Sequence, residues 1–348
     1  MSRKTYDLTS LVQWGTIVIE NDNDKLLIRE RINMKLKTRL IQIYENIYAS
    51  NFVMSLLYKY KNRNYQLNIM KTEDTVRYII ETGCSVARFG EGEFELMLSP
   101  SKNLGFQVHS DELAEKLVEV IQCNNENLLI CVPYALNSIW GRTKHSRMFW
   151  YSWGNFENQH CRIVDLIKKV QDSTYVFGDT QISRPYVAYK SSNKAKRIFP
   201  ALKKIWDGKD VIIVEGSKTR LGVGNNLFDN VLSVKRILAP AENAFSCYQL
   251  IIQEVVKIYK HELILLALGP TATVLAYEFS KLNMRALDLG HIDIEYEWFL
   301  HGSHGHDIIS GKYTNEAEGG NVVDDCLDEN YLKEIVAKIE HQDEYADV

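Results

Sequence analysis

The chain has 348 residues, of which 45% are hydrophobic, so it can form one large domain with an appendage or two domains. Its formal net charge of −4 excludes a global basic field that would attract nucleic acid or an acidic membrane. Six cysteines without a C-x-x-C pair favour reduced thiols in a cytoplasmic protein. The N-terminus lacks the apolar core of a signal peptide, and we expect no membrane-spanning segment.

Apolar residues recur at roughly helical spacing from Lys25 to Lys61, which predicts one or two amphipathic helices. These helices either cover the main domain or form a contact between copies in a homo-oligomer. We therefore expect an N-terminal helical segment at residues 1–65 and a main domain at 66–330. A C-terminal helix and an acidic tail are expected at 331–348.

The next part of the chain predicts helices at 72–82 and 111–123, and strands at 84–89 and 127–132. Residues 134–153 follow as a loop-rich region that combines aromatic and basic side chains, among them Trp140, Arg142 and Trp150. Two interpretations are open for this region. The aromatic rings form a platform for a sugar or nucleobase, or they fill the core beneath a long loop.

The second half of the chain alternates between the two kinds of element. Strands are expected at 174–177, 211–214, 233–238, 263–268 and 285–289, and helices at 194–206, 245–259 and 271–282. This alternation predicts a Rossmann-like, mainly parallel sheet flanked by helices. Ligands bind at the carboxyl ends of the strands in such sheets, so the motifs that follow each strand are the candidate site.

An acidic, glycine-spaced segment follows the expected strand at 84–89. On an extended segment Glu91 and Glu93 would point to the same side, which suits a shared Mn²⁺ or Mg²⁺ ion. Arg88 lies just upstream and could bind a phosphate. The alternative is a solvated acidic turn without a ligand.

The segment Glu215–Asn226 contains the strongest signal for phosphate binding, because glycines, hydroxyls and two cations follow a buried strand. It matches neither a Walker loop nor a Rossmann G-x-G-x-x-G fingerprint. The candidate binding residues here are Gly216, Ser217, Lys218, Thr219, Arg220, Gly222, Gly224 and Asn225.

Polar residues also follow three other expected strands. Asp179 and Arg184 follow the first, and Thr271 is expected to cap a helix whose N-terminus can bind an anion. After the last strand come His291, Asp293 and Glu295, which share one face if the segment is extended. If Asp293 caps a helix instead, Glu295 and Glu297 lie in its first turn. His301–His306 has the composition of a metal-binding loop, although nothing in the sequence fixes its geometry.

Taken in order, seven motifs resemble the GT-D family of glycosyltransferases. They are SVARFGEGE (85–93), DTQISRPY (179–186), VEGSKTRLGVGNNLF (214–228), APAENAF (239–245), LGPTATVLAY (268–277), GHIDIEYEWF (290–299) and GKYTNE (311–316). The resemblance implies a sugar-nucleotide donor, usually a UDP-sugar, and a D-x-E motif that holds a divalent metal. This motif maps onto Glu91-Gly92-Glu93, where Glu stands in place of the usual Asp.

We therefore expect a metal-dependent bacterial glycosyltransferase that moves a hexose from a UDP-sugar to a hydroxyl of a glycan, glycoprotein or lipid-linked acceptor. Asp293, Glu295 and Asp179 are the candidate bases, and the Arg, Lys and loop residues named above bind the diphosphate. The expected location is the cytoplasm or the inner face of the membrane. Two alternatives are another nucleotide-binding α/β enzyme, such as a methyltransferase or dehydrogenase, and a non-catalytic binding module.

Overall fold

The computed structural model describes residues 37–39, 51–100, 102–303, 307–314 and 316–341. The chain divides into two compact units, residues 1–50 and residues 51–348. Most of the helical pattern expected before residue 51, and the acidic tail at 342–348, lie outside the described residues. Within the described part, no helix combines the length and apolar character needed to cross a membrane.

Eight strands of the second unit form one sheet in the described residues, in the order β3-β2-β1-β7-β6-β4-β5-β8. Every neighbouring pair is parallel, which confirms the expected fold class. The strands are β1 (Ser85–Arg88), β2 (Leu128–Val132), β3 (Gly178–Asp179), β4 (Asp210–Gly216), β5 (Ser233–Ala239), β6 (Leu263–Ala267), β7 (Ala286–Asp288) and β8 (Ile335–Lys338). The central strands β1, β6 and β7 are buried throughout, as expected for a sheet covered on both faces.

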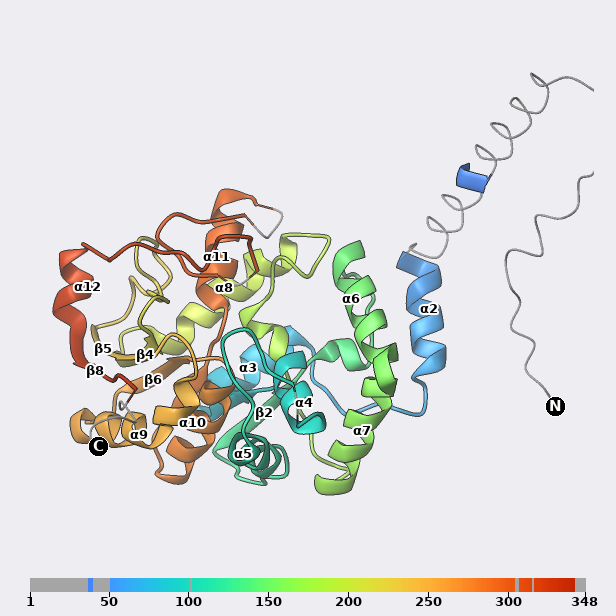
Figure 1. Cartoon of the computed structure of the whole chain (residues 1–348), viewed down its shortest axis with the longest axis horizontal. Helices are drawn as coiled ribbons and strands as arrows, with labels where there is room; N and C mark the ends of the chain where they lie inside the picture. Colours follow the sequence, from blue (N-terminus) through green and yellow to red (C-terminus); the bar gives the residue numbers. More distant parts are fainter. Residues whose placement is uncertain (1–36, 40–50, 101, 304–306, 315, 342–348) are drawn as a thin grey trace, which may run out of the picture. The chain divides into compact units, whose positions relative to one another are not determined.

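Helices cover both faces of this sheet, and Figure 1 shows α8 and α11 on one side of it and α9 and α10 on the other. The helices are α2 (Asn51–Lys61), α3 (Thr72–Thr82), α4 (Glu91–Leu98), α5 (Asp111–Ile121), α6 (Lys144–Asn155), α7 (Gln159–Val170), α8 (Asn193–Trp206), α9 (Tyr248–Ile258), α10 (Pro270–Lys281), α11 (Ile292–His301) and α12 (Glu329–Glu334). Apolar residues of α3, α8 and α11 pack with those of the central strands into one core. Burial of this apolar surface is the main force that holds the layers together.

Local sequence explains most element boundaries. Helix α3 spans the predicted residues, has Glu73 and Asp74 in its first turn, and ends at Gly83 with φ = 69°. Acidic residues favour a helix N-terminus, and glycine adopts this left-handed conformation without strain. Helix α5 begins after Ser110, whose side chain accepts a hydrogen bond from the backbone N–H of Leu113.

Three local predictions were wrong. The strand expected at 174–177 is the two-residue strand β3 instead, and Phe177 forms only an isolated bridge with Ile69. The region expected to be loop-rich contains α6, and α7 follows it without having been predicted. The signal for α7 was present, because its buried residues His160, Ile163, Val164 and Ile167 have helical spacing.

The C-terminal segment belongs to the sheet. Helix α12 ends at Glu334 and leads directly into β8, which pairs with β5. Arg236 on β5 pairs with Glu334 at a distance of 2.6 Å and with the buried Glu215 on β4 at 2.7 Å. Arg236 is 98 positions from Glu334 and 21 from Glu215, so neither pairing could be predicted from local pattern.

Candidate active site

A cavity of about 930 Å³ lies at the carboxyl ends of the parallel strands. Its wall includes the last residues of β1 and β4, Arg88 and Gly216, and three glycines that follow strands, Gly90 after β1, Gly269 after β6 and Gly290 after β7. The position of the cavity therefore follows the rule for open α/β sheets. The expected site residues that line it are Arg88, Glu91, Glu93, Arg184, Gly216, Thr219 and Asp293.

Arg88 lies at the end of β1 and is held by buried partners. Its Nε donates to the backbone oxygen of Asp288 at 2.7 Å, its Nη2 donates to Asp288 Oδ1 at 2.8 Å, and its Nη1 donates to Ser183 Oγ. Burial raises the pKa of Asp288, and the Arg88 guanidinium acts in the opposite direction. Because Arg88 already has a carboxylate partner, it contributes less net positive charge to the cavity than its sequence position suggests.

Glu91 and Glu93 lie in the first turn of α4, so the prediction of an extended segment was wrong. Residues two apart on a helix do not face the same side. Glu93 Oε2 accepts a hydrogen bond from the backbone N–H of Gly90 at 2.7 Å, which ties this carboxylate to the start of the helix. Both glutamates nevertheless line the cavity.

The carboxylates near Gly90 suit a hard divalent cation that is shared with a substrate. Burial raises the pKa of Glu93 to about 7, the Gly90 hydrogen bond opposes the shift, and the charges of Asp288 and Glu91 add to it. A nearby cation would relieve this repulsion. Among the described residues, no three His, Cys, Asp or Glu side chains are arranged to hold a metal by themselves. Mg²⁺ often binds one or two carboxylates and completes its shell with water and phosphate oxygens.

Arg184 and His291 form a second charged cluster on the cavity wall. Arg184 Nη2 lies 2.6 Å from Glu316 Oε2, and His291 Nε2 lies 3.5 Å from Glu316 Oε1. The side chain of His291 is 40% exposed, so it is only partly buried. This partial burial and the charges of Arg184 and Arg88 lower the pKa of His291 to about 4, while Glu316 opposes the shift. The imidazole is therefore neutral at pH 7.

Two of the three candidate bases, Glu295 and Asp179, hold loops by hydrogen bonds and lie outside the cavity wall in the described residues. Glu295 is fully buried, and its Oε2 accepts from the backbone N–H groups of Tyr186 at 3.0 Å and Val187 at 3.1 Å. Asp179 is 1% exposed. Its carboxylate accepts a hydrogen bond from Thr72 Oγ1. It also accepts from the backbone N–H groups of Tyr134 and Gln181, both at 3.1 Å.

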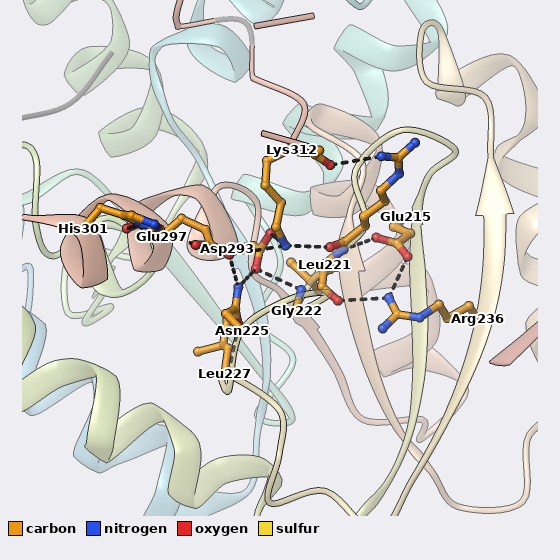
Figure 2. A network of polar contacts seen from close by, with 12 residues as sticks. Glu215, Leu221, Gly222, Asn225, Leu227, Arg236, Asp293, Glu297, His301 and Lys312 are labelled. Atoms are coloured by element: carbon orange, nitrogen blue, oxygen red, sulfur yellow. Dashed lines mark hydrogen bonds and ion pairs between the residues drawn. The ribbon is translucent and has the colours of Figure 1, made fainter. Parts of the chain in front are cut away.

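Asp293 lines the cavity, but both of its carboxylate oxygens are engaged (Figure 2). Oδ1 accepts from the N–H of Gly222 at 2.9 Å and from Asn225 Nδ2 at 2.8 Å. Oδ2 accepts from Lys312 Nζ at 2.7 Å, and both side chains of this ion pair are 6% exposed. This buried pair joins α11 to the loop after β4 and to the segment that contains Lys312.

Within the expected phosphate loop, only Gly216 and Thr219 line the cavity. Ser217 and Lys218 are exposed outside it. Arg220 is 8% exposed and donates to the backbone oxygens of Gly311, at 3.1 Å, and Asp324. The loop therefore offers backbone and hydroxyl groups to the cavity, whereas Arg220 connects it to the C-terminal segment. Gly222 and Gly224 have φ values of 76° and 80°, which glycine tolerates.

Two other predicted features differ in the structure. Helix α10 begins after Gly269, with Pro270 at its start, so the expected N-cap role of Thr271 was wrong. Thr271 is fully buried and is not part of the cavity wall in the described residues. In the histidine-rich loop, His301 Nδ1 lies 2.9 Å from the backbone oxygen of Glu297, and residues 304–306 lie outside the described part.

Comparison with known proteins shows which family has this arrangement. Residues 86–317 match the family model of the glycosyltransferase GT-D fold. The chain belongs to this family. A solved structure described as a new glycosyltransferase from Streptococcus sanguinis is 34% identical. It has a TM-score of 0.72, and the match covers 79% of this chain and 100% of that one. Another, described as domain of unknown function 1792 with a distinct glycosyltransferase fold, is 33% identical. It has a TM-score of 0.73, with coverage of 84% and 100%.

Two curated relatives of the family come from streptococci. Glycosyltransferase GlyD of Streptococcus pneumoniae serotype 4 is 35% identical over 274 residues, which is 78% of this chain. The probable glycosyl transferase Gly of Streptococcus gordonii is 36% identical over 275 residues, which is 79% of this chain. The chain spans only 33% and 39% of the lengths of these two relatives.

The structure adds cavity residues that were not among the expected site residues, namely Asp288, His291 and Glu316. Asp288 ends a strand that had been predicted, so its position at a strand end was a usable signal. Glu316 lies far from any strand, and only tertiary packing brings it to Arg184. The aromatic region contributes as well, because Phe149 and Trp150 of α6 line the cavity.

Proposed function

We propose that this chain transfers a hexosyl group from a nucleotide diphosphate sugar, most simply a UDP-hexose, to an acceptor hydroxyl. The observation that carries the proposal is the cavity at the strand ends of a GT-D family member, with arginines, carboxylates and a neutral histidine in its wall. Its volume of about 930 Å³ is large enough for a sugar nucleotide. The acceptor would be a glycan, glycoprotein or lipid-linked sugar in surface polysaccharide or glycoprotein assembly.

The donor would bind along the strand ends. Backbone N–H groups near Gly216 and Thr219 and the N-terminus of α10 at Gly269 offer hydrogen bonds and a favourable dipole to the diphosphate. Arg184 would stabilise the negative charge that develops as the diphosphate leaves. Mn²⁺ or Mg²⁺ held by Glu91 and Glu93 would supply further charge neutralisation at the diphosphate.

We assign proton transfer to His291. During reaction the acceptor oxygen forms a bond to the anomeric carbon of the donor, and the bond from that carbon to the diphosphate oxygen breaks. The acceptor proton passes to a nitrogen of His291, which Glu316 stabilises in its protonated form. Asp293, Glu295 and Asp179 then act as positioning residues, because their oxygens are occupied by the donors described above.

The metal proposal is tested by UDP titrations in Mn²⁺ and in chelator, measured by calorimetry. Mn²⁺ should raise the UDP affinity of the native protein by on the order of tenfold, because binding of the cation and of the diphosphate is coupled. Glu93→Gln should remove most of that gain, whereas Glu329→Gln, an exposed acid 84% open to solvent, should keep it. Equal metal dependence in all three proteins would remove Glu93 from the metal site.

The assignment of His291 is tested with His291→Asn. The rate of sugar transfer from UDP-hexose to the acceptor should fall by roughly 100-fold or more, the usual size of a general-base effect. UDP affinity should stay nearly unchanged, and the exposed His261→Gln serves as the matched control. Normal transfer by His291→Asn would return the role to the carboxylates. UDP binding without any sugar transfer in the native protein would instead favour a non-catalytic module.

A further inference from the structure

Helix α2 is fixed to the rest of its unit through one face. Met54 is fully buried, and Tyr58 is 2% exposed. The Tyr58 hydroxyl lies 3.1 Å from Nδ1 of the buried His160 on α7. Lys61 also donates to Asn155 at the end of α6. Figure 1 shows α2 beside α6 at the edge of this unit. These contacts set the orientation of α2, and they also determine which residues lie on the opposite face of the helix.

That opposite face is apolar and exposed. Phe52, Leu56 and Tyr60 are spaced by four residues, so they form one stripe, and they are 61%, 50% and 69% exposed. Trp140 is 58% exposed and meets Phe52 edge-to-face, with ring centroids 6.5 Å apart. We call these four residues the α2 surface. Contiguous apolar patches of this kind usually mark an interaction site.

The segment that carries the α2 surface is basic, in contrast to the chain as a whole. Residues 51–72 contain four Lys and Arg residues and no Asp or Glu. This is a local net charge of +4 in a chain whose total is −4. Lys59 and Lys61 are exposed on α2 itself, and the guanidinium of Arg63 lies over the Tyr60 ring at 4.3 Å.

We propose that the α2 surface binds the interface of an anionic lipid bilayer. Aromatic rings prefer the boundary between headgroups and acyl chains, and each Lys or Arg near an anionic surface adds to the attraction. A second copy of the chain is a poorer occupant. A two-fold interface places the same patch on both sides, and would bring the Lys and Arg side chains of two copies together.

The position of α6 connects this surface with the cavity. Helix α6 packs against α2, while its residues His145, Ser146 and Phe149 line the cavity. A bilayer at the α2 surface would therefore lie one helix away from the cavity wall. Membrane binding goes beyond the proposed transfer reaction, and it would bring a lipid-linked acceptor to the enzyme.

The test is sedimentation of the full chain with vesicles. The native protein should bind vesicles of phosphatidylcholine mixed with phosphatidylglycerol, and should bind pure phosphatidylcholine at least tenfold less. Phe52→Ser/Tyr60→Ser and Lys59→Glu/Lys61→Glu should each lose most of the binding, and added salt should weaken it. Leu232→Ser/Leu327→Ser, which changes two exposed leucines elsewhere, is the matched control.

Each outcome decides the proposal. Equal vesicle binding by the native protein and both α2 variants, or no binding by any of them, would overturn it. Light scattering on the same samples identifies the alternative occupant, because a native dimer that becomes monomeric in Phe52→Ser/Tyr60→Ser would make the α2 surface an interface between copies.

The altered side chains are exposed, so melting temperatures close to that of the native protein would confirm that folding is intact. UDP binding is measured separately from vesicle binding. A protein that binds vesicles but not UDP would contradict the proposed function alone, and one that binds UDP but not vesicles would contradict the membrane proposal alone.

Discussion

The role of each charged residue in this protein depends on the groups that reach it. Asp293 and His291 lie two positions apart near the end of β7, yet Asp293 is held by three donors whereas His291 remains open to the cavity. Arg220 and Arg184 both follow strands, but only Arg184 lines the cavity. Residue type and strand-end position therefore identify candidates, and hydrogen-bond partners distinguish side chains that are open to the cavity from those engaged within the fold.

The stability of the fold should depend on pH through His160. This side chain is 1% exposed, and burial lowers its pKa from 6.5 to about 4. Below pH 6.5 the unfolded state binds a proton that the folded state does not, so stability is lost as pH falls toward 4. The loss is about 3 kcal/mol at most, from 1.36 kcal/mol per pKa unit. Urea unfolding at pH 7.5 and pH 4.5 should show a smaller change for His160→Gln than for the native protein, and an equal change would contradict the prediction.

At the scale of elements, one polar network joins three segments that are distant in sequence. The loop after β4, the start of α11 and the segment near Lys312 meet at Asp293 (Figure 2). Lys312 also donates to the backbone oxygen of Arg220 at 3.1 Å. Because Tyr313, Thr314 and Glu316 follow Lys312 and line the cavity, this anchor holds one wall of the site in place.

The Asp293–Lys312 pair should show strong energetic coupling. Asp293→Asn should destabilise the protein by about 3 kcal/mol, because it leaves a buried ammonium without its closest carboxylate. Glu297 lies 3.7 Å from Lys312 Nζ and limits the loss. Asp293→Asn/Lys312→Met should be less destabilised than the sum of the two single variants, since no buried charge is left unpaired. Urea unfolding of the four proteins measures the coupling, and strictly additive losses would show that the pair is not coupled.

At the scale of the whole molecule, the strand order determines where the site can form. Strand β1 lies between β2 and β7, β6 lies on the other side of β7, and β4 lies beyond β6. Loops from both halves of the chain therefore meet at one edge of the sheet. Strand β8 covers β5, which would otherwise present unpaired backbone groups at the edge. The sheet is completed by residues near the C-terminus, outside the range 86–317 that matches the family.

The sequence by itself determined the alternation of helices and strands, the parallel sheet, and the motifs at the strand ends. These depend on apolar periodicity and turn residues, which act over a few positions. It did not reveal α6, whose aromatic residues serve both the core and the cavity, or the helical first turn at Glu91. Only the tertiary structure decided that Arg220 and Asp293 hold segments together and that Glu316 joins His291. The reason is that buried carboxylates and guanidinium groups take whichever partners the packed chain brings within hydrogen-bond distance.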